Sequence, residues 1–170
     1  DLTVERRDDA VAMFFPLYDT SPAEAPAPLL AALGITTVMD TRWSEKNKNL
    51  LLVIPEATVL QQLSPDFTAL VQSATGLNGV LVTAPSSNSL YDYEYRYFWP
   101  WAGTNEDPVT GGIQTYLARY WSNKLGKQSM NAFQCSERTG VMQLQLKEDR
   151  LQITGKAVII LEGKLCIPLQ

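Results

Sequence analysis

A polar segment between a strand pattern and a helix pattern holds the side chains best suited to chemistry. Glu106 and Asp107 supply carboxylates. Gly111 and Gly112 follow, directly before an apolar helical pattern that begins at Ile113. Unpaired N–H groups at a helix N-terminus and the helix dipole attract anions, and glycine lets a ligand approach the backbone closely. The pattern suggests that the glycines bind a ligand carboxylate while a neighbouring acid moves a proton. A purely structural interpretation, in which the loop caps the helix and its acids are solvated, also fits these residues.

The composition narrows the possible chemistry. The chain of 170 residues contains no histidine, which removes the commonest general base and the commonest ligand for transition metals. Its two cysteines, Cys135 and Cys166, form no CxxC pattern, so we expect neither a disulfide framework nor a zinc site. We expect no bound metal, and acid–base chemistry would fall to Asp, Glu, Lys, Tyr or Cys side chains.

Charge and hydropathy argue against two kinds of partner. The formal net charge is -4 and the Lys and Arg residues are scattered, so we expect no binding to nucleic acid. The longest apolar runs, Leu50–Pro55 and Ala157–Leu161, are far shorter than the ~18 residues that span a bilayer, so we expect no membrane segment. With the low cysteine content, this favours a cytoplasmic protein. Because the chain begins with Asp1 rather than Met, we expect that it was processed, trimmed or cut from a longer one.

Two regular elements must position the polar segment. From Tyr91 to Trp99 aromatic residues alternate with charged ones, and this period of two predicts a strand with one aromatic face. From Ile113 to Trp121 the apolar residues recur at helical spacing, and Gly126 ends the helix. The aromatic face could stack a planar ligand, although such a row more often packs into a core. The side chains of this helix are bulky and nearly uncharged, so we expect them to be buried. A strongly curved sheet that wraps around the helix would bury them.

The rest of the chain is dominated by strand patterns with three short helices. Strands are expected at Leu2–Arg6, Val11–Phe15, Ile35–Arg42, Leu50–Ile54, Val80–Thr83, Met130–Cys135, Val141–Lys147, Arg150–Thr154 and Ala157–Leu161, the last covered on both faces. Helices are expected at Leu29–Leu33, Glu56–Leu63 and Pro65–Gln72, the last with Ser64 as its N-cap. We therefore predict a single α+β domain over residues 1–170, with a strongly curved, barrel-like, mostly antiparallel sheet wrapped around a central helix.

Several motifs resemble one known family. Residues 101–111 read Trp-Ala-Gly-Thr-Asn-Glu-Asp-Pro-Val-Thr-Gly, of which Asp-Pro-Val-Thr-Gly is the most specific part. Further matches are Tyr120-Trp121-Ser122, Leu125-Gly126-Lys127, Ala132-Phe133-Gln134-Cys135-Ser136 and Leu161-Glu162-Gly163. These motifs resemble the phenazine-biosynthesis-like (PhzF-type) isomerases of the diaminopimelate-epimerase superfamily. The resemblance spans essentially the whole chain, but it covers only the second, C-terminal half of a family member.

The resemblance implies a fold and a place for the site. Each half of a family member is a barrel-like sheet around a central helix, and the active site lies in the cleft between the halves. Residues 1–16 resemble the strands that pass between the two domains, and the first family domain is absent from this chain. The expected partners are therefore the missing N-terminal half or a second copy in a homodimer.

The resemblance also implies residue roles. The family enzymes need no cofactor, and a carboxylic acid from the first half moves a proton on the substrate. By match, Asp107 would be catalytic, either by hydrogen-bonding the substrate or by sharing in proton transfer. Thr110, Gly111 and Gly112 would bind the carboxylate of a small metabolite. Trp101 would line the cleft as part of the substrate site or hold its loop closed.

Two functions are consistent with these features. The first is a PhzF-like isomerase or epimerase domain that acts by acid–base proton transfer and is complete only with the first half. The alternative is a catalytically inactive half-fold protein that binds a small molecule or pairs with itself or another chain. The alternative is favoured by the sequence Gly111-Gly112-Ile113-Gln114, where relatives commonly read Gly-Ser-Ala-His. Cys135 could act as a nucleophile, but its strand context favours a buried structural thiol.

Overall fold

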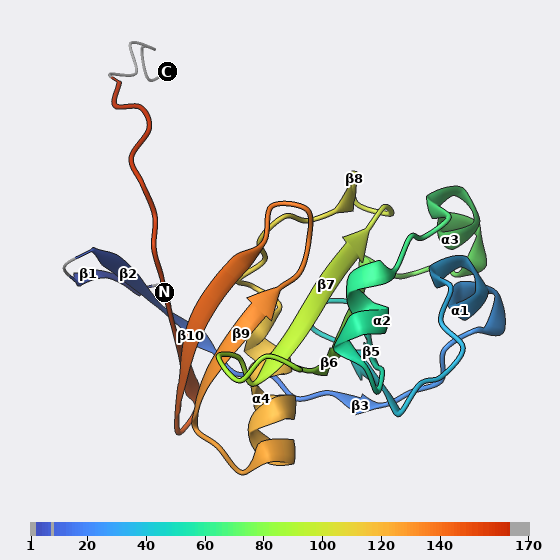
Figure 1. The fold of residues 1–170 in the computed structure, drawn as a ribbon, viewed down its shortest axis with the longest axis horizontal. Helices are drawn as coiled ribbons and strands as arrows, with labels where there is room; N and C mark the ends of the chain where they lie inside the picture. The colour runs from blue at the N-terminus through green and yellow to red at the C-terminus, as the bar shows by residue number, and fades with distance from the viewer. Residues whose placement is uncertain (1–2, 8, 164–170) are drawn as a thin grey trace.

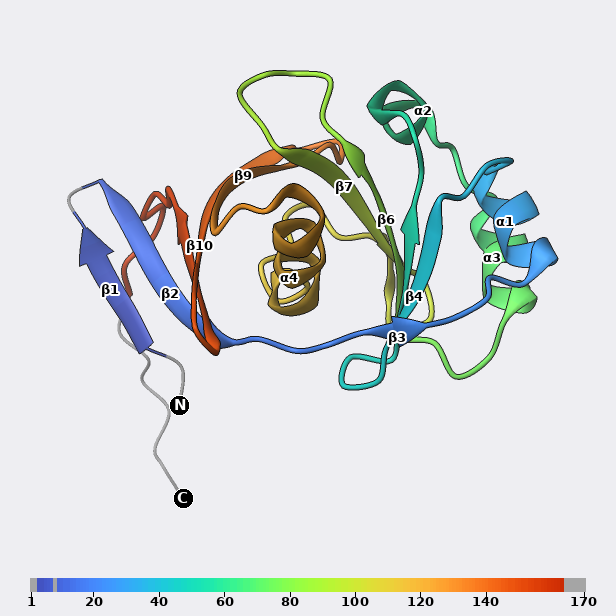
Figure 2. The ribbon, with the colours of Figure 1, turned by 90° about the horizontal axis from the view of Figure 1, so that it is seen from below.

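One open, strongly curved sheet organises the molecule (Figures 1 and 2). The computed structural model describes residues 3–7 and 9–163. The strands lie in the order β1-β2-β11-β10-β9-β7-β6-β5-β4-β3, and β8 pairs with β7 outside this path. The strands are β1 Thr3–Arg7, β2 Ala10–Pro16, β3 Ser21–Pro22, β4 Asp40–Ser44, β5 Asn49–Val53, β6 Gly79–Pro85, β7 Tyr93–Trp99, β8 Thr104–Glu106, β9 Ser129–Gln134, β10 Gly140–Lys147 and β11 Arg150–Gly155. The helices are α1 Ala27–Leu33, α2 Ala57–Gln62, α3 Phe67–Ser73 and α4 Gln114–Leu125.

The sheet is mostly antiparallel, as predicted, with two parallel pairs. These pairs are β5–β6 and β7–β9. A parallel pair needs a crossover connection, which here contains α2 and α3 in the first case and α4 in the second. The two crossovers place their helices on opposite faces of the sheet (Figure 2).

The concave face of the sheet wraps around α4 (Figure 2). Tyr116, Leu117 and Trp121 of this helix are buried, as the helical spacing predicted. They pack in one core cluster with the aromatic row of β7, in which the rings of Tyr93 and Trp121 stack with centroids 5.4 Å apart. The aromatic row therefore belongs mainly to the core. Gly126 ends the helix at a φ of 66°, a conformation that glycine adopts without steric cost.

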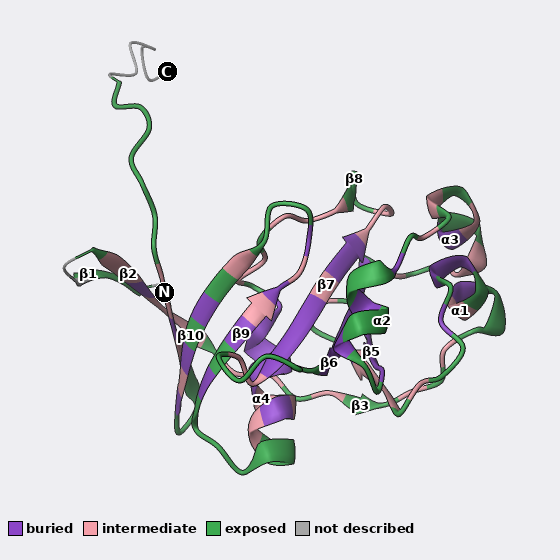
Figure 3. Ribbon diagram, viewed as in Figure 1, coloured by how far each residue is buried: buried purple, intermediate pink, exposed green. Residues whose placement is uncertain are grey.

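Helices α1, α2 and α3 cover the opposite face of the sheet at one end (Figure 1). Strand β6 separates the two cores, with Leu81 in the α4 cluster and Val80 and Val82 in the second cluster. The middle strands β5 and β6 are therefore buried on both faces, whereas β9 and β10 alternate between buried and exposed residues (Figure 3). The site described below lies where the double-covered strands approach the start of α4.

The sheet does not close into the predicted barrel. Within the described residues its strand order begins at β1 and ends at β3. The mixed α+β, sheet-dominated architecture around a central helix is confirmed. Strands β3 and β8 contain 2 and 3 residues, too few for a periodic pattern to reveal them in the sequence.

Three local predictions were wrong. Ala157–Leu161 forms no strand, and Ile160 within it is 94% exposed. An apolar run indicates that its side chains favour burial, but it does not identify the residues that would pack against them. The strand expected from Ile35 begins only at Asp40. The N-cap of α3 is Asp66 rather than Ser64, because an Asp66 carboxylate oxygen accepts the N–H of Ala69 at 3.0 Å.

The predictions about membrane segments and about cysteines can be compared only with the residues that the structure describes. In that part, no helix is both long and apolar enough to cross a membrane. Cys166 lies outside the described residues.

Candidate functional site

Strands β7 and β9 hold the loop between β8 and α4 in a fixed position. The backbone N–H of Asp107 donates to the carbonyl of Tyr97 at 3.0 Å. The fully buried side chain of Gln134, at the end of β9, donates through Nε2 to the Asp107 carbonyl at 2.5 Å. Its Oε1 accepts the N–H of Thr110 at 2.6 Å. Ser136 Oγ donates to the carbonyl of Pro108 at 2.5 Å. The buried Gln134 therefore fixes both ends of the Asp107–Thr110 turn.

The carboxylate of Asp107 is oriented by its own loop. Thr110 Oγ1 donates to Asp107 Oδ2 at 2.5 Å. Both donors of Thr110 are thus used inside the protein, so this residue positions Asp107, whereas the sequence predicted that it binds substrate. The neighbouring Glu106 is paired elsewhere, because its two oxygens accept from Arg96 Nε and Nη2 at 2.8 and 2.7 Å. Of the two acids, Asp107 remains available, and Oδ1 receives no hydrogen bond from the described residues.

The glycine turn begins α4 and leaves several donors unpaired. The carbonyls of Gly111 and Gly112 accept the N–H groups of Gln114 and Thr115 at 3.0 and 3.3 Å. In contrast, no hydrogen bond among the described residues uses the N–H groups of Gly111, Gly112 or Ile113 as donors. Gly112 is exposed, and a Cβ added there would meet nothing within 4 Å. The turn that leads into α4 therefore presents free amides beside the positive end of the helix.

Asp107 and the glycine turn share one cavity of about 510 Å³. From the loop, Asp107, Thr110 and Gly112 line it. The other lining residues include members of β7 and of the turn between β4 and β5: Tyr97, Trp99, Lys46 and Asn47. The indole N–H of Trp99 is buried and has no hydrogen-bond partner within the described chain. The cavity therefore combines a carboxylate with residues whose backbone amides are unpaired.

A buried hydrogen-bond network supports the cavity wall. Tyr97 OH donates to Asn49 Oδ1 at 3.3 Å, and Asn49 Nδ2 donates to Tyr116 OH at 3.0 Å. This network joins β7, β5 and α4. Burial raises the pKa of Tyr97 above its ordinary value, so the phenol stays protonated at neutral pH and serves as a donor rather than as an acid.

Trp101 holds its loop against a neighbouring helix. It does not line the cavity, and its indole N–H donates to the carbonyls of Ala74 and Val71 at 3.2 and 3.3 Å. Trp101 therefore attaches its loop to the end of α3, and its contact with substrate stays a prediction.

Two other positions of the signature also lie away from the cavity lining. Gly111 lies beside the core, where an added Cβ would meet Ile153 Cδ1 at 4.0 Å. Gln114 stands where the family resemblance implies a His; its side chain is fully buried and its Oε1 accepts from Tyr93 OH at 2.6 Å. Its Nε2 is buried without a partner among the residues described. The position therefore belongs to the core next to the site.

Cys135 is a structural thiol. Its Sγ donates to the carbonyl of Tyr95 at 3.6 Å, and burial raises its pKa to about 12. A thiol with this pKa is protonated at neutral pH and is a poor nucleophile. These properties agree with the interpretation, favoured by the sequence, that Cys135 is a buried structural thiol.

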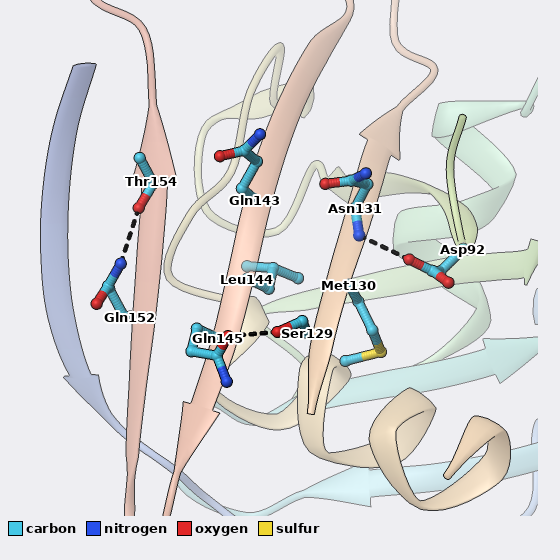
Figure 4. Close-up of a pocket in the computed structure, with 9 residues that line it drawn as sticks. All are labelled: Asp92, Ser129, Met130, Asn131, Gln143, Leu144, Gln145, Gln152 and Thr154. Carbon is cyan, nitrogen blue, oxygen red and sulfur yellow. Dashed lines mark hydrogen bonds between the residues drawn. The ribbon is translucent and has the colours of Figure 1, made fainter. Parts of the chain in front are cut away.

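A second hollow lies on the outer face of β9, β10 and β11 (Figure 4). Amides and hydroxyls line much of it, and some bond to one another, as Gln152 Nε2 does to Thr154 Oγ1 at 3.1 Å. Its acid, Asp92, accepts the N–H of Asn131 at 2.7 Å and pairs with Lys127 at 2.5 Å. Because that charge is already neutralised, the hollow offers less for acid–base chemistry than the cavity at Asp107.

Comparison with known proteins agrees with the signature around Asp107. The profile of the PhzC-PhzF family, described as phenazine biosynthesis-like protein, matches residues 5–163. The chain belongs to this family. A phenazine biosynthesis-like domain-containing protein 2 from Mus musculus is 38% identical over 178 residues, covering 97% of this chain and 62% of the mouse protein. A Pseudomonas aeruginosa protein described as an uncharacterized isomerase is 37% identical over 165 residues, covering 97% of this chain and 61% of that protein.

A solved structure of the phenazine biosynthesis-like family has the same fold. The crystal structure of a PhzF-family phenazine biosynthesis protein from Enterococcus faecalis matches with a TM-score of 0.86 and 28% sequence identity. The match covers 98% of this chain and 61% of that one. The chain thus spans about 62% of the length of the curated relatives that it matches.

The sequence analysis missed three residues that contact Asp107 or line the cavity beside it. Gln134 lay inside a family motif but was given no role. Asn49 is a polar residue at the start of an apolar run, a sign that its side chain has a buried partner. Lys46 lies between the strands expected at Ile35–Arg42 and Leu50–Ile54, in a segment to which no role was given. No local pattern links these residues to Asp107, since they come from distant parts of the chain.

Proposed function

We propose that this chain is the C-terminal, carboxylate-binding half of a PhzF-like cofactor-independent isomerase or epimerase, which shifts a proton on a small carboxylate-bearing metabolite. One observation carries the proposal: Asp107 lines the same cavity as Gly112 and Ile113, whose backbone N–H groups are unpaired among the described residues. Membership of the phenazine biosynthesis-like family and the isomerase description of the Pseudomonas aeruginosa relative support the reaction class.

The amides at the start of α4 bind the substrate carboxylate. The N–H groups of Gly112 and Ile113 lie at the positive end of a 12-residue helix and have no partner among the described residues. Gly111, which was also predicted to bind the carboxylate, lies outside the cavity lining. Hydrogen bonds from amides to a carboxylate are charge-assisted and therefore stronger than neutral ones.

Asp107 acts on the proton that moves. The Thr110 hydroxyl donates to Oδ2, which leaves Oδ1 to hydrogen-bond the substrate or to share in proton transfer. An isomerisation removes one proton from a substrate atom and returns one at another, so the composition of the substrate does not change. The second proton-transfer group is the carboxylic acid that the first half brings.

The first half, or a second copy of this chain, completes the cavity. In this proposal residues 1–16 are the strands that connect the two halves, and residues 1–170 form one domain. The homologous proteins are longer by a part that this chain does not span, which supports the presence of a second wall. We place the protein in the cytoplasm because its chemistry needs neither disulfides nor a membrane.

The test is the Asp107→Asn variant of the complete protein, with its first half present. The amide keeps an oxygen that can accept from Thr110, so the fold should be unchanged. Loss of general acid–base action should lower turnover by roughly 10²- to 10⁴-fold. Turnover can be followed without a known substrate by incubating the enzyme with metabolite mixtures in D₂O and measuring deuterium in small carboxylates by mass spectrometry. Deuterium incorporation at the wild-type rate would remove Asp107 from the mechanism.

A catalytically inactive half-fold that pairs with itself is the second candidate. The observation in its favour is the exposed apolar run Val158–Leu161, whose four side chains are 73–94% exposed. Such a run favours burial against a partner. Sedimentation of this chain, with and without a separately expressed first half, distinguishes the two functions. A stable homodimer that does not bind the separately expressed first half supports the inactive half-fold. A monomer that binds the first half supports the isomerase.

A further inference from the structure

The turn between β4 and β5 brings a cation to the cavity. Lys46 lines the cavity together with Asp107 and Gly112. Its ammonium makes no ion pair or hydrogen bond with any residue that the structure describes. The nearby acid cannot neutralise it, because Glu45 already accepts from Lys48 Nζ and from Trp43 Nε1. Lys46 is thus an uncommitted positive charge at the site.

The turn that carries Lys46 is held in place by its neighbours. Ser44 Oγ donates to Asn47 Oδ1 at 3.1 Å. Asn78 Nδ2 donates to the Asn47 carbonyl at 2.9 Å, and the Asn78 N–H donates to the Lys48 carbonyl at 2.8 Å. The backbone beside Lys46 is therefore fixed against the start of β6, although the long Lys side chain can still adjust to a ligand.

The lining of the cavity offers two separate places for an anionic group. The free amides at the start of α4 can bind one anionic group, and Asp107 repels any anion that stands beside it. Lys46 is the cation among the lining residues. The chain as a whole carries a formal net charge of -4, so a dianion would need a local positive charge to bind.

We infer that Lys46 binds a second anionic group of the ligand. The substrate class is therefore a small molecule with two anionic groups, one held by the α4 amides and the other by the Lys46 ammonium. This inference rests on the proposed function, since it assigns the first group to the glycine turn. It adds a specificity-determining residue from a part of the chain that the family signature does not include.

The test compares matched mono- and dicarboxylates on this chain. The ¹⁵N-labelled chain is titrated at low salt with butyrate and succinate, valerate and glutarate, and hexanoate and adipate, while the amide of Gly112 is followed by NMR. For at least one pair the dicarboxylate should bind roughly two- to fivefold more tightly, the range expected for one exposed ion pair. In the Lys46→Gln variant this preference should disappear while the affinity for the monocarboxylate stays the same.

The matched control is Lys124→Gln, which removes the same charge near the C-terminal end of α4. Lys124 does not line this cavity and stacks over the ring of Tyr120. The control should keep the preference for the dicarboxylate. The inference is overturned if no pair shows a preference, or if Lys46→Gln weakens both members of a pair equally. If neither kind of probe shifts the Gly112 amide, the proposed carboxylate site fails as well, so the two failures can be told apart.

Discussion

The side chain of Gln134 should be the main support of the Asp107–Thr110 loop. It is fully buried, and it bonds both to the carbonyl of Asp107 and to the N–H of Thr110. Replacing it with Met keeps an unbranched chain of similar size but removes both bonds and leaves two loop groups unpaired. Each lost bond with its unpaired partner costs about 1–2 kcal/mol, so the free energy of unfolding should fall by about 2–4 kcal/mol.

The assay is urea unfolding followed by tryptophan fluorescence, combined with NMR of the loop amides. With a slope of about 2 kcal/mol per molar urea, the midpoint should fall by about 1–2 M. The amides of Thr110 and Gly112 should shift. The matched control is Gln143→Met on the exposed side of β10, which should change the stability by less than about 0.5 kcal/mol.

Gln134→Glu adds a pH test of the same reasoning. The introduced carboxyl can still accept from Thr110, but when ionised it cannot donate to the Asp107 carbonyl. Burial should raise its folded-state pKa above about 4.3, the ordinary value for Glu. The variant should therefore be destabilised at neutral pH and recover toward the wild type as the pH falls through that raised pKa.

Two results would refute the role of Gln134. One is a Gln134→Met variant within about 0.5 kcal/mol of the wild type, the range of an ordinary surface substitution. The other is a stability of Gln134→Glu, relative to wild type, that does not depend on pH. Either result would mean that the loop is held by other contacts.

Other substitutions test the glycine positions and the thiol. Gly112→Ser should fold normally and gain less than about 1 kcal/mol, because an added Cβ meets nothing within 4 Å; a clear loss in thermal unfolding would contradict the open position. Gly79→Ala should lose about 1–3 kcal/mol in the same assay, because its Cβ would lie 2.6 Å from Cε2 of Tyr97, and an unchanged melting temperature would show that this packing is looser. Cys135 should resist iodoacetamide at pH 8 in the native protein and react after denaturation, since burial raises its pKa to about 12; peptide mapping that finds it alkylated in the native protein would show an accessible thiolate.

The sequence determined the elements with strong local patterns. The alternation from Tyr91 to Trp99 gave the position of β7, and the helical spacing from Ile113 gave the position of α4. The signature around Asp107 identified the loop between them and the family. These features depend on residues close together in the chain, whose periodicity or motif can be recognised without knowing what they contact.

The tertiary structure decided which side chains surround that loop. Gln134 reaches Asp107 because β7 and β9 pair in parallel, and Lys46 reaches the cavity because β5 pairs in parallel with β6. Trp101 is close to Asp107 in sequence but bonds to α3 instead. The apolar run Ala157–Leu161 shows the same limit, since its composition indicated a need for cover but no partner. Strand pairing joins residues that are far apart in the chain, so the partners of a side chain are fixed by the register of the sheet and not by local sequence.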